Sequence, residues 1–280
     1  TGVMLSFLKL ERNDITDTTI DVLFGGPADA YVIGARDGLF EKYMSPERAN
    51  IAQDHMDKHG YWSGVYLGSI GFAVNQSRLD VLGVRTPTGW DDLLLPELRG
   101  EISMANPVSS GTGYTILATL VQIMGKSNAF KYLKALDSNI LDYTRSGAMP
   151  GKLVGLSQIA VGILFSHDVL AFRQQGYDID LIFPEEGTGF EIGGIAIVKG
   201  TKRLEEAKRF VDFMLSTEGQ NLYAAMGEFR LPTNELASIP AGAVPFNKIR
   251  VIDYDATWAA IQKRDLLQEW TATLDDAGGE

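Results

Sequence analysis

Residues 100–124, GEISMANPVSSGTGYTILATLVQIM, join a short apolar strand to an apolar helix through a turn rich in serine and glycine. The first amides of a helix have no intrahelical acceptors, the helix dipole adds partial positive charge there, and hydroxyl groups can donate beside them. The turn is therefore predicted to bind an anionic group such as a phosphate or a carboxylate. A structural interpretation, in which one hydroxyl caps the helix, stays open beside it. The residues concerned are Ser109, Ser110, Gly111 and Thr112.

The rest of the chain repeats this alternation of strands and helices. Segments of strand character lie at 18–24, 62–75, 100–105, 140–143, 159–165, 178–184 and 192–198, with helical patterns between most of them. Short strands alternating with helices predict an α/β protein with parallel sheets.

Two glycine-bearing strand segments, Ile70–Asn75 and Gly193–Val198, bracket a middle region that has its own complete alternation. This bracketing predicts an inserted domain, with the two strand segments forming a hinge. Lobe 1 is expected to consist of residues 1–75 and 194–245, lobe 2 of residues 76–193, and a helical tail of residues 246–280 is assigned to neither lobe. Ligands of open α/β sheets bind beyond the carboxyl ends of strands. The polar strand ends expected to face such a cleft include Gly26, Ser146, Gly147, His167, Asp168 and Glu191.

His167 and Asp168 follow the apolar strand segment 159–165, and Glu191 stands among glycines and apolar residues. Both carboxylates can accept hydrogen bonds from sugar hydroxyls or pair with an amine, and the imidazole can donate to a hydroxyl or a phosphate. An adjacent His-Asp pair is also typical of a helix cap, and that interpretation stays open. An unpaired carboxylate among apolar neighbours costs free energy, so Glu191 is a stronger candidate for ligand binding than Asp168.

The composition argues against several classes of function. A net charge of −11 and a pI near 4.8 argue against nucleic acid or an acidic membrane surface as the main partner. The chain has no cysteine and no nucleophile-elbow, zinc-protease, phosphate-loop or dinucleotide motif. We therefore expect no catalytic residues, no cofactor and no metal. His55 and His59 have the spacing of a helical metal site, but the charged segment around them favours a solvated helix face.

Several motifs taken together resemble the family 1 extracellular solute-binding proteins of ABC importers. The resemblance covers nearly the whole chain and implies a two-lobed type II periplasmic binding fold that closes on its ligand and delivers it to a membrane permease. It also implies a monomer that is periplasmic or, in a Gram-positive cell, extracellular and associated with the membrane. The motifs are Pro87-Thr88-Gly89-Trp90-Asp91-Asp92-Leu93, Gly100-Glu101-Ile102, the turn 106–114, DVLFGGPADA at 21–30, GFAVN at 71–75, residues 191–198 and AKRFVDFMLSTEGQ at 207–220.

The resemblance also distinguishes branches of this family. Ferric-ion binders carry adjacent tyrosines near the position held here by residues 166–168, and this chain has no Tyr-Tyr pair. Because phenolates are natural ligands of Fe(III), iron is disfavoured. The segments 143–147 and 185–191 are instead similar to a branch often labelled as iron binding that binds sugar phosphates. By that resemblance, the hydroxyl groups of the sugar would be bound by His167, Asp168 and Glu191. The phosphoryl group would be bound by hydroxyls and amides near Ser109–Thr112, Ser146, Thr1 and Gly2.

The leading hypothesis is a substrate-binding protein for a phosphorylated organic ligand, most simply a hexose phosphate. Other ligands are possible within the same class of protein. An aminoalkylphosphonate would pair its amine with Asp168 and Glu191, whereas inorganic sulfate or phosphate would leave those carboxylates unused. Ferric iron is a further alternative. From another class, an enzyme acting on a phosphorylated substrate would use His167 as an acid or base. Family members begin with a strand, a helix and a second strand that do not precede Thr1 here, so we expect that an N-terminal piece has been removed.

Overall fold

The structure is a computed structural model that describes Leu5, Leu8, Lys9 and residues 19–275 of the 280-residue chain. The chain divides into two compact units, each assembled from segments that are distant in sequence. The lobe boundaries expected at residues 75 and 193 stay a prediction. The first unit comprises Thr1–Gly68, Glu191–Ala243 and Ala256–Ile261, and the second unit comprises Ser69–Phe190, Val244–Asp255 and Gln262–Glu280.

The second unit contains a mixed sheet. Its strand β3 (Ile102–Ala105) pairs in parallel with both β5 (Val161–Phe165) and β4 (Ile140–Thr144). The long strand β2 (Ser63–Val74) runs antiparallel to β5 and to the short strand β6 (Asp180–Ile182). The expected parallel arrangement therefore holds for β3, β4 and β5, whereas β2 reverses the direction at one side. The segment of strand character expected at 62–75 is this single strand.

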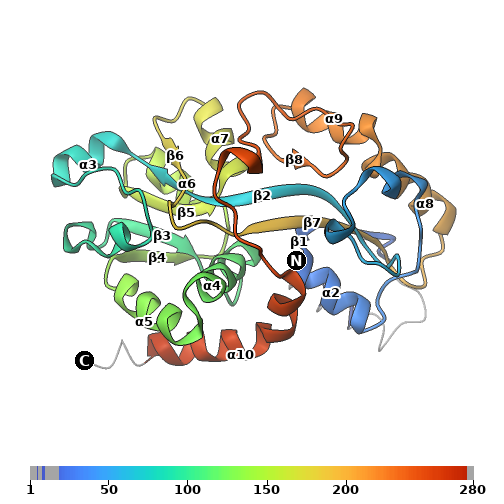
Figure 1. Ribbon diagram of the computed structural model, residues 1–280, viewed down its shortest axis with the longest axis horizontal. Coiled ribbons are helices and arrows are strands. Elements are labelled where there is room, and N and C mark those ends of the chain that lie inside the picture. Colours follow the sequence, from blue (N-terminus) through green and yellow to red (C-terminus); the bar gives the residue numbers. More distant parts are fainter. Residues whose placement is uncertain (1–4, 6–7, 10–18, 276–280) are drawn as a thin grey trace. The chain divides into compact units, whose positions relative to one another are not determined.

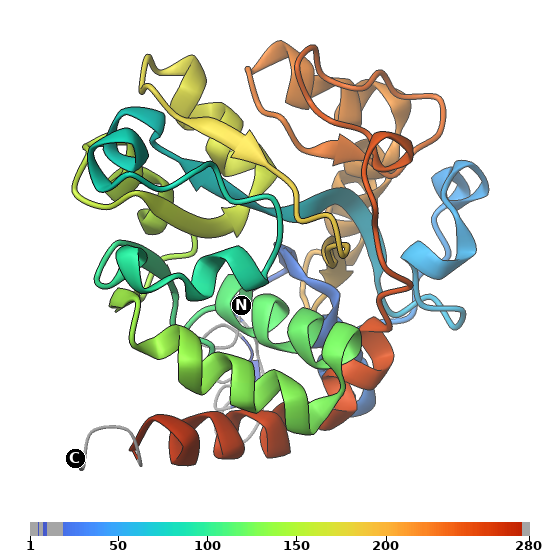
Figure 2. The same cartoon turned by 60° about the vertical axis from the view of Figure 1, so that its left-hand side comes forward.

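Helices cover both faces of these parallel strands. The helices α4 (Gly111–Met124) and α5 (Lys126–Asp137) connect β3 to β4, and α6 (Met149–Gly155) connects β4 to β5 on the other side of β3. Parallel crossovers are right-handed, so two connections that step in opposite directions place their helices on opposite faces. Figures 1 and 2 both draw α4 and α5 together on one side of the strands, away from α6. The unit also contains α3 (Gln76–Leu82) and α7 (Ser166–Gln174).

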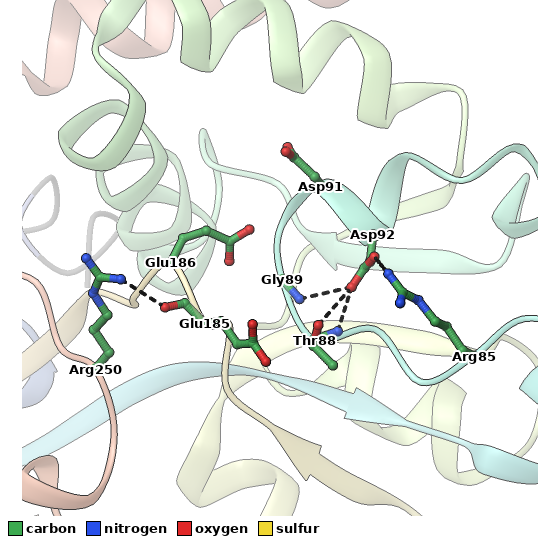
Figure 3. Close-up of a pocket in the computed structure, with 8 residues that line it drawn as sticks. All are labelled: Arg85, Thr88, Gly89, Asp91, Asp92, Glu185, Glu186 and Arg250. Atoms are coloured by element: carbon green, nitrogen blue, oxygen red, sulfur yellow. Dashed lines mark hydrogen bonds and ion pairs between the residues drawn. The ribbon is translucent and has the colours of Figure 1, made fainter.

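The turn before β3 is held by the carboxylate of Asp92. One of its oxygens accepts the backbone N–H groups of Thr88 at 2.8 Å and Gly89 at 3.2 Å, and the other accepts Nη2 of Arg85 at 2.9 Å. Figure 3 shows these bonds at the border of a polar recess of about 430 Å³. The Asp92 side chain is 15% exposed, so these bonds are partly shielded from water.

Trp90 fastens the same turn to the loop before β7. Its backbone N–H donates to the Glu186 carboxylate at 3.1 Å, and its indole N–H donates to the Gly187 carbonyl at 3.1 Å. The ring is fully buried and packs edge-on against Phe72 of β2. Within the Trp-Asp-Asp motif, Trp90 and Asp92 therefore have structural roles.

The Asp92 bonds predict a stability that depends on pH. The Thr88 N–H, followed by the other bonds and the charge of Arg85, lowers the pKa of Asp92. A carboxyl group whose folded pKa is depressed adds stability above its unfolded pKa and loses it as pH falls through the folded pKa. We expect Asp92→Asn to lower the free energy of unfolding by about 1–2 kcal/mol at pH 7, and the deficit to shrink as pH falls below the ordinary carboxyl range, about pH 4, and through the lowered folded pKa of Asp92. Urea unfolding from pH 7 to low pH measures this loss of stability, and Asp91→Asn, at an exposed neighbouring carboxylate, is the control. A deficit that stays unchanged at low pH would contradict the prediction.

The first unit is built around β7 (Phe190–Ile197). This strand lies between β1 (Val22–Pro27) and β2 in the strand order and runs antiparallel to β1. The short strand β8 (Leu231–Pro232) pairs with β2 at Tyr66 and Leu67. The helices α2 (Ala28–Arg36) and α8 (Leu204–Leu215) follow β1 and β7, and α9 (Thr217–Ala225) follows α8.

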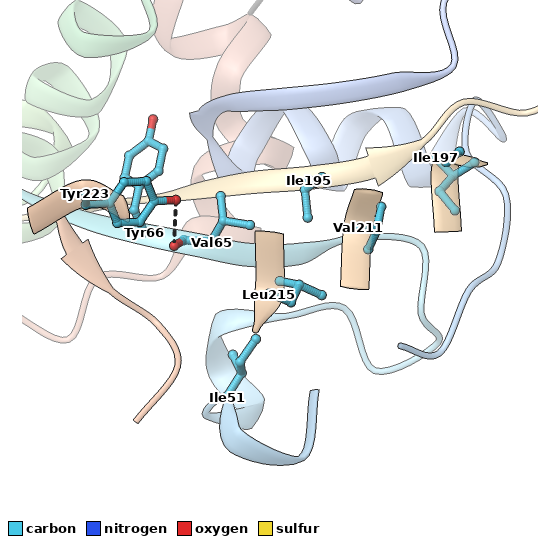
Figure 4. Packing of buried hydrophobic residues seen from close by; sticks show 9 residues of the cluster. Ile51, Val65, Tyr66, Ile195, Ile197, Val211, Leu215 and Tyr223 are labelled. Carbon is cyan, nitrogen blue, oxygen red and sulfur yellow. Dashed lines mark hydrogen bonds between the residues drawn. The ribbon is translucent and has the colours of Figure 1, made fainter. Parts of the chain in front are cut away.

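A cluster of buried side chains lies between α8, β2 and β7. The helix α8 contributes Ala207, Val211 and Leu215, every fourth residue, because this spacing places them on one face of a helix. In Figure 4 Tyr66 and Tyr223 lie at one end of the cluster, and the Tyr223 hydroxyl donates to the Val65 carbonyl at 3.2 Å. The helix α10 (Ala256–Asp275) closes the described chain. Shorter 3₁₀ turns span Pro46–Asn50, Gln53–His55, Asp91–Leu94, Pro96–Leu98 and Phe246–Lys248.

The histidine pair does not share a helix face, so that expectation was wrong. His55 ends a 3₁₀ turn, whereas His59 lies in a separate turn. The Asp57 carboxylate accepts the His59 N–H at 2.8 Å and the Tyr61 N–H at 3.1 Å. A side chain that bonds to the backbone in this way stabilises a turn in place of a helix.

Candidate functional site

Three of the predicted segments lie at one edge of the second unit. Because β3, β4 and β5 are parallel, their last residues, Ala105, Thr144 and Phe165, end at the same side of the sheet. The residues that follow them form what we term the carboxyl edge. Its predicted members are Ser109, Ser110, Gly111, Thr112, Ser146, Gly147, His167 and Asp168.

The turn at the start of α4 combines a cap with a place for an anion. Ser110 is the N-cap, and its Oγ accepts the Gly113 N–H at 3.4 Å, so the capping interpretation holds for this residue. The N–H groups of Ser109 and Ser110 donate to the Asn106 carbonyl at 3.2 and 2.9 Å. The helix begins at Gly111, which places Gly111 and Thr112 in its first turn. Amides at these positions have no intrahelical acceptor and point toward an anion.

Ser146 and Gly147 lie against this helix start. A methyl group on Gly147 would overlap the side chain of Thr112, so only glycine allows the two segments to approach this closely. The Thr144 hydroxyl donates to the Ser146 carbonyl at 2.8 Å and fixes the turn that follows β4. The Ser146 side chain is exposed. The structure therefore brings two of the predicted ligand-binding residues, Thr112 and Gly147, into contact.

His167 and Asp168 belong to the first turn of α7, which begins at Ser166. The N-cap of α7 is Phe165, so neither residue is the cap, and the capping interpretation was wrong. His167 is 4% exposed and stacks on Phe165 with the ring centres 5.4 Å apart. Its Nε2 lies 3.8 Å from the Asp168 carboxylate, whose side chain is 24% exposed. A carboxylate in the first turn is favoured by the helix dipole, and it also offers an acceptor at the carboxyl edge.

Gly26 and Glu191 belong to the first unit. Gly26, with φ of +81°, donates its N–H to the Tyr66 hydroxyl at 3.1 Å. Gly25, with φ of +80°, accepts the Tyr31 hydroxyl at 2.8 Å. These left-handed conformations favour glycine, so two tyrosines fix a bulge in β1 that other residues would strain.

Glu191 lies inside β7, which begins two residues before the strand segment expected at 192–198. It is 4% exposed, and its charge acts on two buried phenols. Burial, followed by the charge of Glu191, raises the pKa of Tyr66, and burial, then Tyr66, then Glu191 raise the pKa of Tyr31. Methyl groups at Gly193 and Gly194 would overlap the rings of Tyr66 and Tyr31 respectively. The two glycines of β7 thus allow both rings to lie directly on the strand.

Sequence reasoning missed Tyr31, Tyr66 and Arg230. Arg230 lies with its guanidinium carbon 5.2 Å from the centre of the Tyr66 ring and forms an ion pair with Glu228. A signal for a close approach was present, because glycines inside a strand mark such sites, but it does not say that tyrosine rings fill the space. No comparable local signal marks Arg230.

Two of the predicted residues, Thr1 and Gly2, lie outside the described residues. Within the part of the chain that the structure describes, no three His, Asp or Glu side chains gather as metal ligands. Over the same residues, each helix is too short or too polar to cross a membrane.

The amino-acid sequence matches the bacterial extracellular solute-binding protein family over residues 14–257. The chain belongs to this family. An uncharacterized protein of Haemophilus influenzae is 38% identical over 273 residues, which cover 95% of this chain and 79% of the relative.

Two solved structures are similar over almost the whole chain. The periplasmic binding protein AfuA of Actinobacillus pleuropneumoniae, with exogenous fructose 6-phosphate bound, has a TM-score of 0.93 and 37% identity. The similarity covers 98% of this chain and 88% of AfuA. The periplasmic binding protein P5PA has a TM-score of 0.91 and 32% identity over 97% of this chain and 88% of its own.

Family membership confirms the fold class expected from the sequence, which is the α/β, two-lobed type of the periplasmic binding proteins. This solute-binding protein is the substrate-binding component of an ABC importer, so its partners are a small ligand and a permease. Such proteins carry their ligand without chemical change, and the expectation that the chain is not an enzyme is confirmed. The family is extracellular or periplasmic.

Proposed function

We propose that this solute-binding protein captures a hexose phosphate. The observation that carries the proposal is its similarity at 37% identity to AfuA, which was solved with fructose 6-phosphate bound. The carboxyl edge supports it from the residues upward, because an anion-receptive helix start and a carboxylate beside an imidazole belong to the same edge.

The phosphoryl group is assigned to the start of α4. The amides of Gly111 and Thr112 and the helix dipole suit a dianion, and the hydroxyls of Ser109, Thr112 and Ser146 can donate to its oxygens. Contact between Thr112 and Gly147 supports a shared role for these two segments. Such local donors act at contact distance, so the net charge of −11 does not oppose binding.

The sugar hydroxyls are assigned to His167 and Asp168 of the second unit and Glu191 of the first. Carboxylates accept hydrogen bonds from hydroxyl groups, and their geometry selects among sugars. Because the assigned residues come from both units, closure of two lobes on the ligand is part of the proposal. We assign the protein to the periplasm as a monomer.

Ferric iron is a weaker candidate for the ligand, because the tyrosines of the first unit do not suit it. Ferric ion favours phenolate ligands, and the hydroxyls of Tyr31 and Tyr66 are already engaged by the Gly25 carbonyl and the Gly26 N–H. The residues at 166–168 contain no tyrosine. An aminoalkylphosphonate would use the same helix start and pair its amine with Asp168 and Glu191.

Thermal unfolding with a ligand panel tests the proposal. The panel is fructose 6-phosphate, glucose 6-phosphate, glucose, inorganic phosphate, 2-aminoethylphosphonate and ferric citrate. A ligand at 100 times its Kd stabilises the folded state by about 2.7 kcal/mol. We expect the sugar phosphates to raise Tm, and glucose or phosphate alone to leave it unchanged. A rise only with the phosphonate or with iron would refute the hexose phosphate.

A further inference from the structure

The helix α7 begins without the kind of side chain that usually fixes a helix start. Its N-cap is Phe165, whose ring has no atom that accepts a backbone N–H, as a serine or aspartate would. His167 and Asp168 lie in this first turn, and His167 stacks on Phe165 with the ring centres 5.4 Å apart and the planes 17° from parallel. The direction of both side chains therefore depends on what holds the turn from outside the helix.

The strand β2 provides such a contact. Its ladder with β5 pairs Ile70 with Phe165. One residue further, a hydrogen bond of 3.0 Å joins the hydroxyls of Ser69 and Ser166. Ser69 is 1% exposed and Ser166 is 8% exposed, so water competes little for this bond. The two serines thus extend the pairing of the strands by one residue, into the first residue of α7.

The β2 side of this bond is fixed independently of α7. Ile70, the neighbour of Ser69, donates its backbone N–H to the Gly189 carbonyl at 3.0 Å. Its own carbonyl accepts the hydroxyl of the buried Thr188 at 2.8 Å. The backbone next to Ser69 is therefore held from the side opposite to β5, and Ser69 offers Ser166 a fixed partner.

We propose that Ser69 is a positioning residue for the sugar-binding side chains of α7, an inference that rests on the proposed function. Its bond to Ser166 holds the first turn of α7 against β2 and sets the direction of His167 and Asp168. Ser69 is almost completely buried, so it acts through Ser166 and does not touch the ligand. Hydrogen bonds to sugar hydroxyls depend on direction, so a small displacement of His167 or Asp168 weakens binding.

A double-mutant cycle separates positioning from stability. The variants are Ser69→Ala, Ser166→Ala and the double variant, each measured by urea unfolding and by calorimetric titration with fructose 6-phosphate at pH 7.5. Each single variant leaves one buried hydroxyl without its partner and should lower the urea midpoint, whereas the double variant removes both hydroxyls and should recover much of that loss. We expect the affinity to fall about tenfold in all three variants, because each lacks the bond between β2 and α7.

The matched control is Ser103→Ala. Ser103 is a fully buried serine of β3 in the same sheet, and its hydroxyl donates to the Asp142 carbonyl at 2.9 Å. Its replacement should lower the urea midpoint and leave the affinity unchanged. An equal loss of affinity in Ser103→Ala, or an affinity that recovers with stability in the double variant, would mean that Ser69 has a merely structural role. Either result would overturn the proposal, as would full affinity in Ser69→Ala.

A second measurement needs no ligand. Nuclear Overhauser effects between the ring protons of His167 and Phe165 report their stacking in the free protein, and His167→Gln assigns the His167 signals among those of the three histidines. We expect Ser69→Ala to weaken these effects and Ser103→Ala to leave them unchanged. Unchanged effects in Ser69→Ala would overturn the proposal. If the natural protein does not bind fructose 6-phosphate, the proposed function fails, and this measurement still decides whether Ser69 positions α7.

Discussion

The Glu191→Gln variant is expected to bind fructose 6-phosphate roughly 10- to 100-fold more weakly than the natural protein at pH 7.5. A hydrogen bond from a sugar hydroxyl to a carboxylate is charge-assisted, and Glu191 is 4% exposed, where water competes little for that bond. Asp168→Asn is expected to cause a loss of the same size from the second unit. Isothermal titration calorimetry measures both affinities.

The matched control for this experiment is Glu185→Gln. Glu185 is an exposed glutamate in the loop before β7 and is assigned no role in ligand binding. Its replacement should leave the affinity unchanged. Full affinity in both Glu191→Gln and Asp168→Asn would exclude these carboxylates from the sugar site.

The Gly193→Ala substitution is expected to destabilise the first unit by about 3 kcal/mol or more. The new methyl group would overlap the ring of Tyr66. That ring has little room to move, because its hydroxyl is bonded to Gly26, Tyr223 packs edge-on against it and Arg230 covers its face. Urea unfolding at pH 7 measures the loss.

A double-mutant cycle with Tyr66→Ala separates overlap from other effects of the methyl group. Removing the ring frees the space above β7, so Gly193→Ala should cost less than about 1 kcal/mol in that background. An equal cost in both backgrounds would mean that contact with Tyr66 is not the cause.

The parts of the candidate site that follow directly from local sequence could be predicted. The strand, turn and helix around residues 106–114 are contiguous, so their order alone indicated a helix start beyond a strand end. His167 and Asp168 were placed at the carboxyl edge because they directly follow an apolar strand segment, and the parallel pairing of β3 and β5 puts them at the edge that holds the α4 turn.

The first-unit contacts could not be predicted, because they join residues that are distant in the chain. Gly26 bonds to Tyr66, and Tyr66 lies under Arg230, and no local pattern links these three positions. The role of the Trp-Asp-Asp motif was also hidden in the sequence. Its indole and amide bond to residues 186–187, which lie almost a hundred positions further along.

The pairing of β1 with β7 has a consequence for how the protein is made in the cell. Val22 pairs with Ile197, so at 5–20 residues per second the ribosome needs roughly ten to thirty seconds to supply the partner strand. During that interval β1 lacks this partner, while most of the second unit, whose main segment is Ser69–Phe190, is synthesised without interruption. The first unit can therefore complete its sheet only after β7 has been made, and its remaining elements α8, α9 and β8 lie still further along the chain.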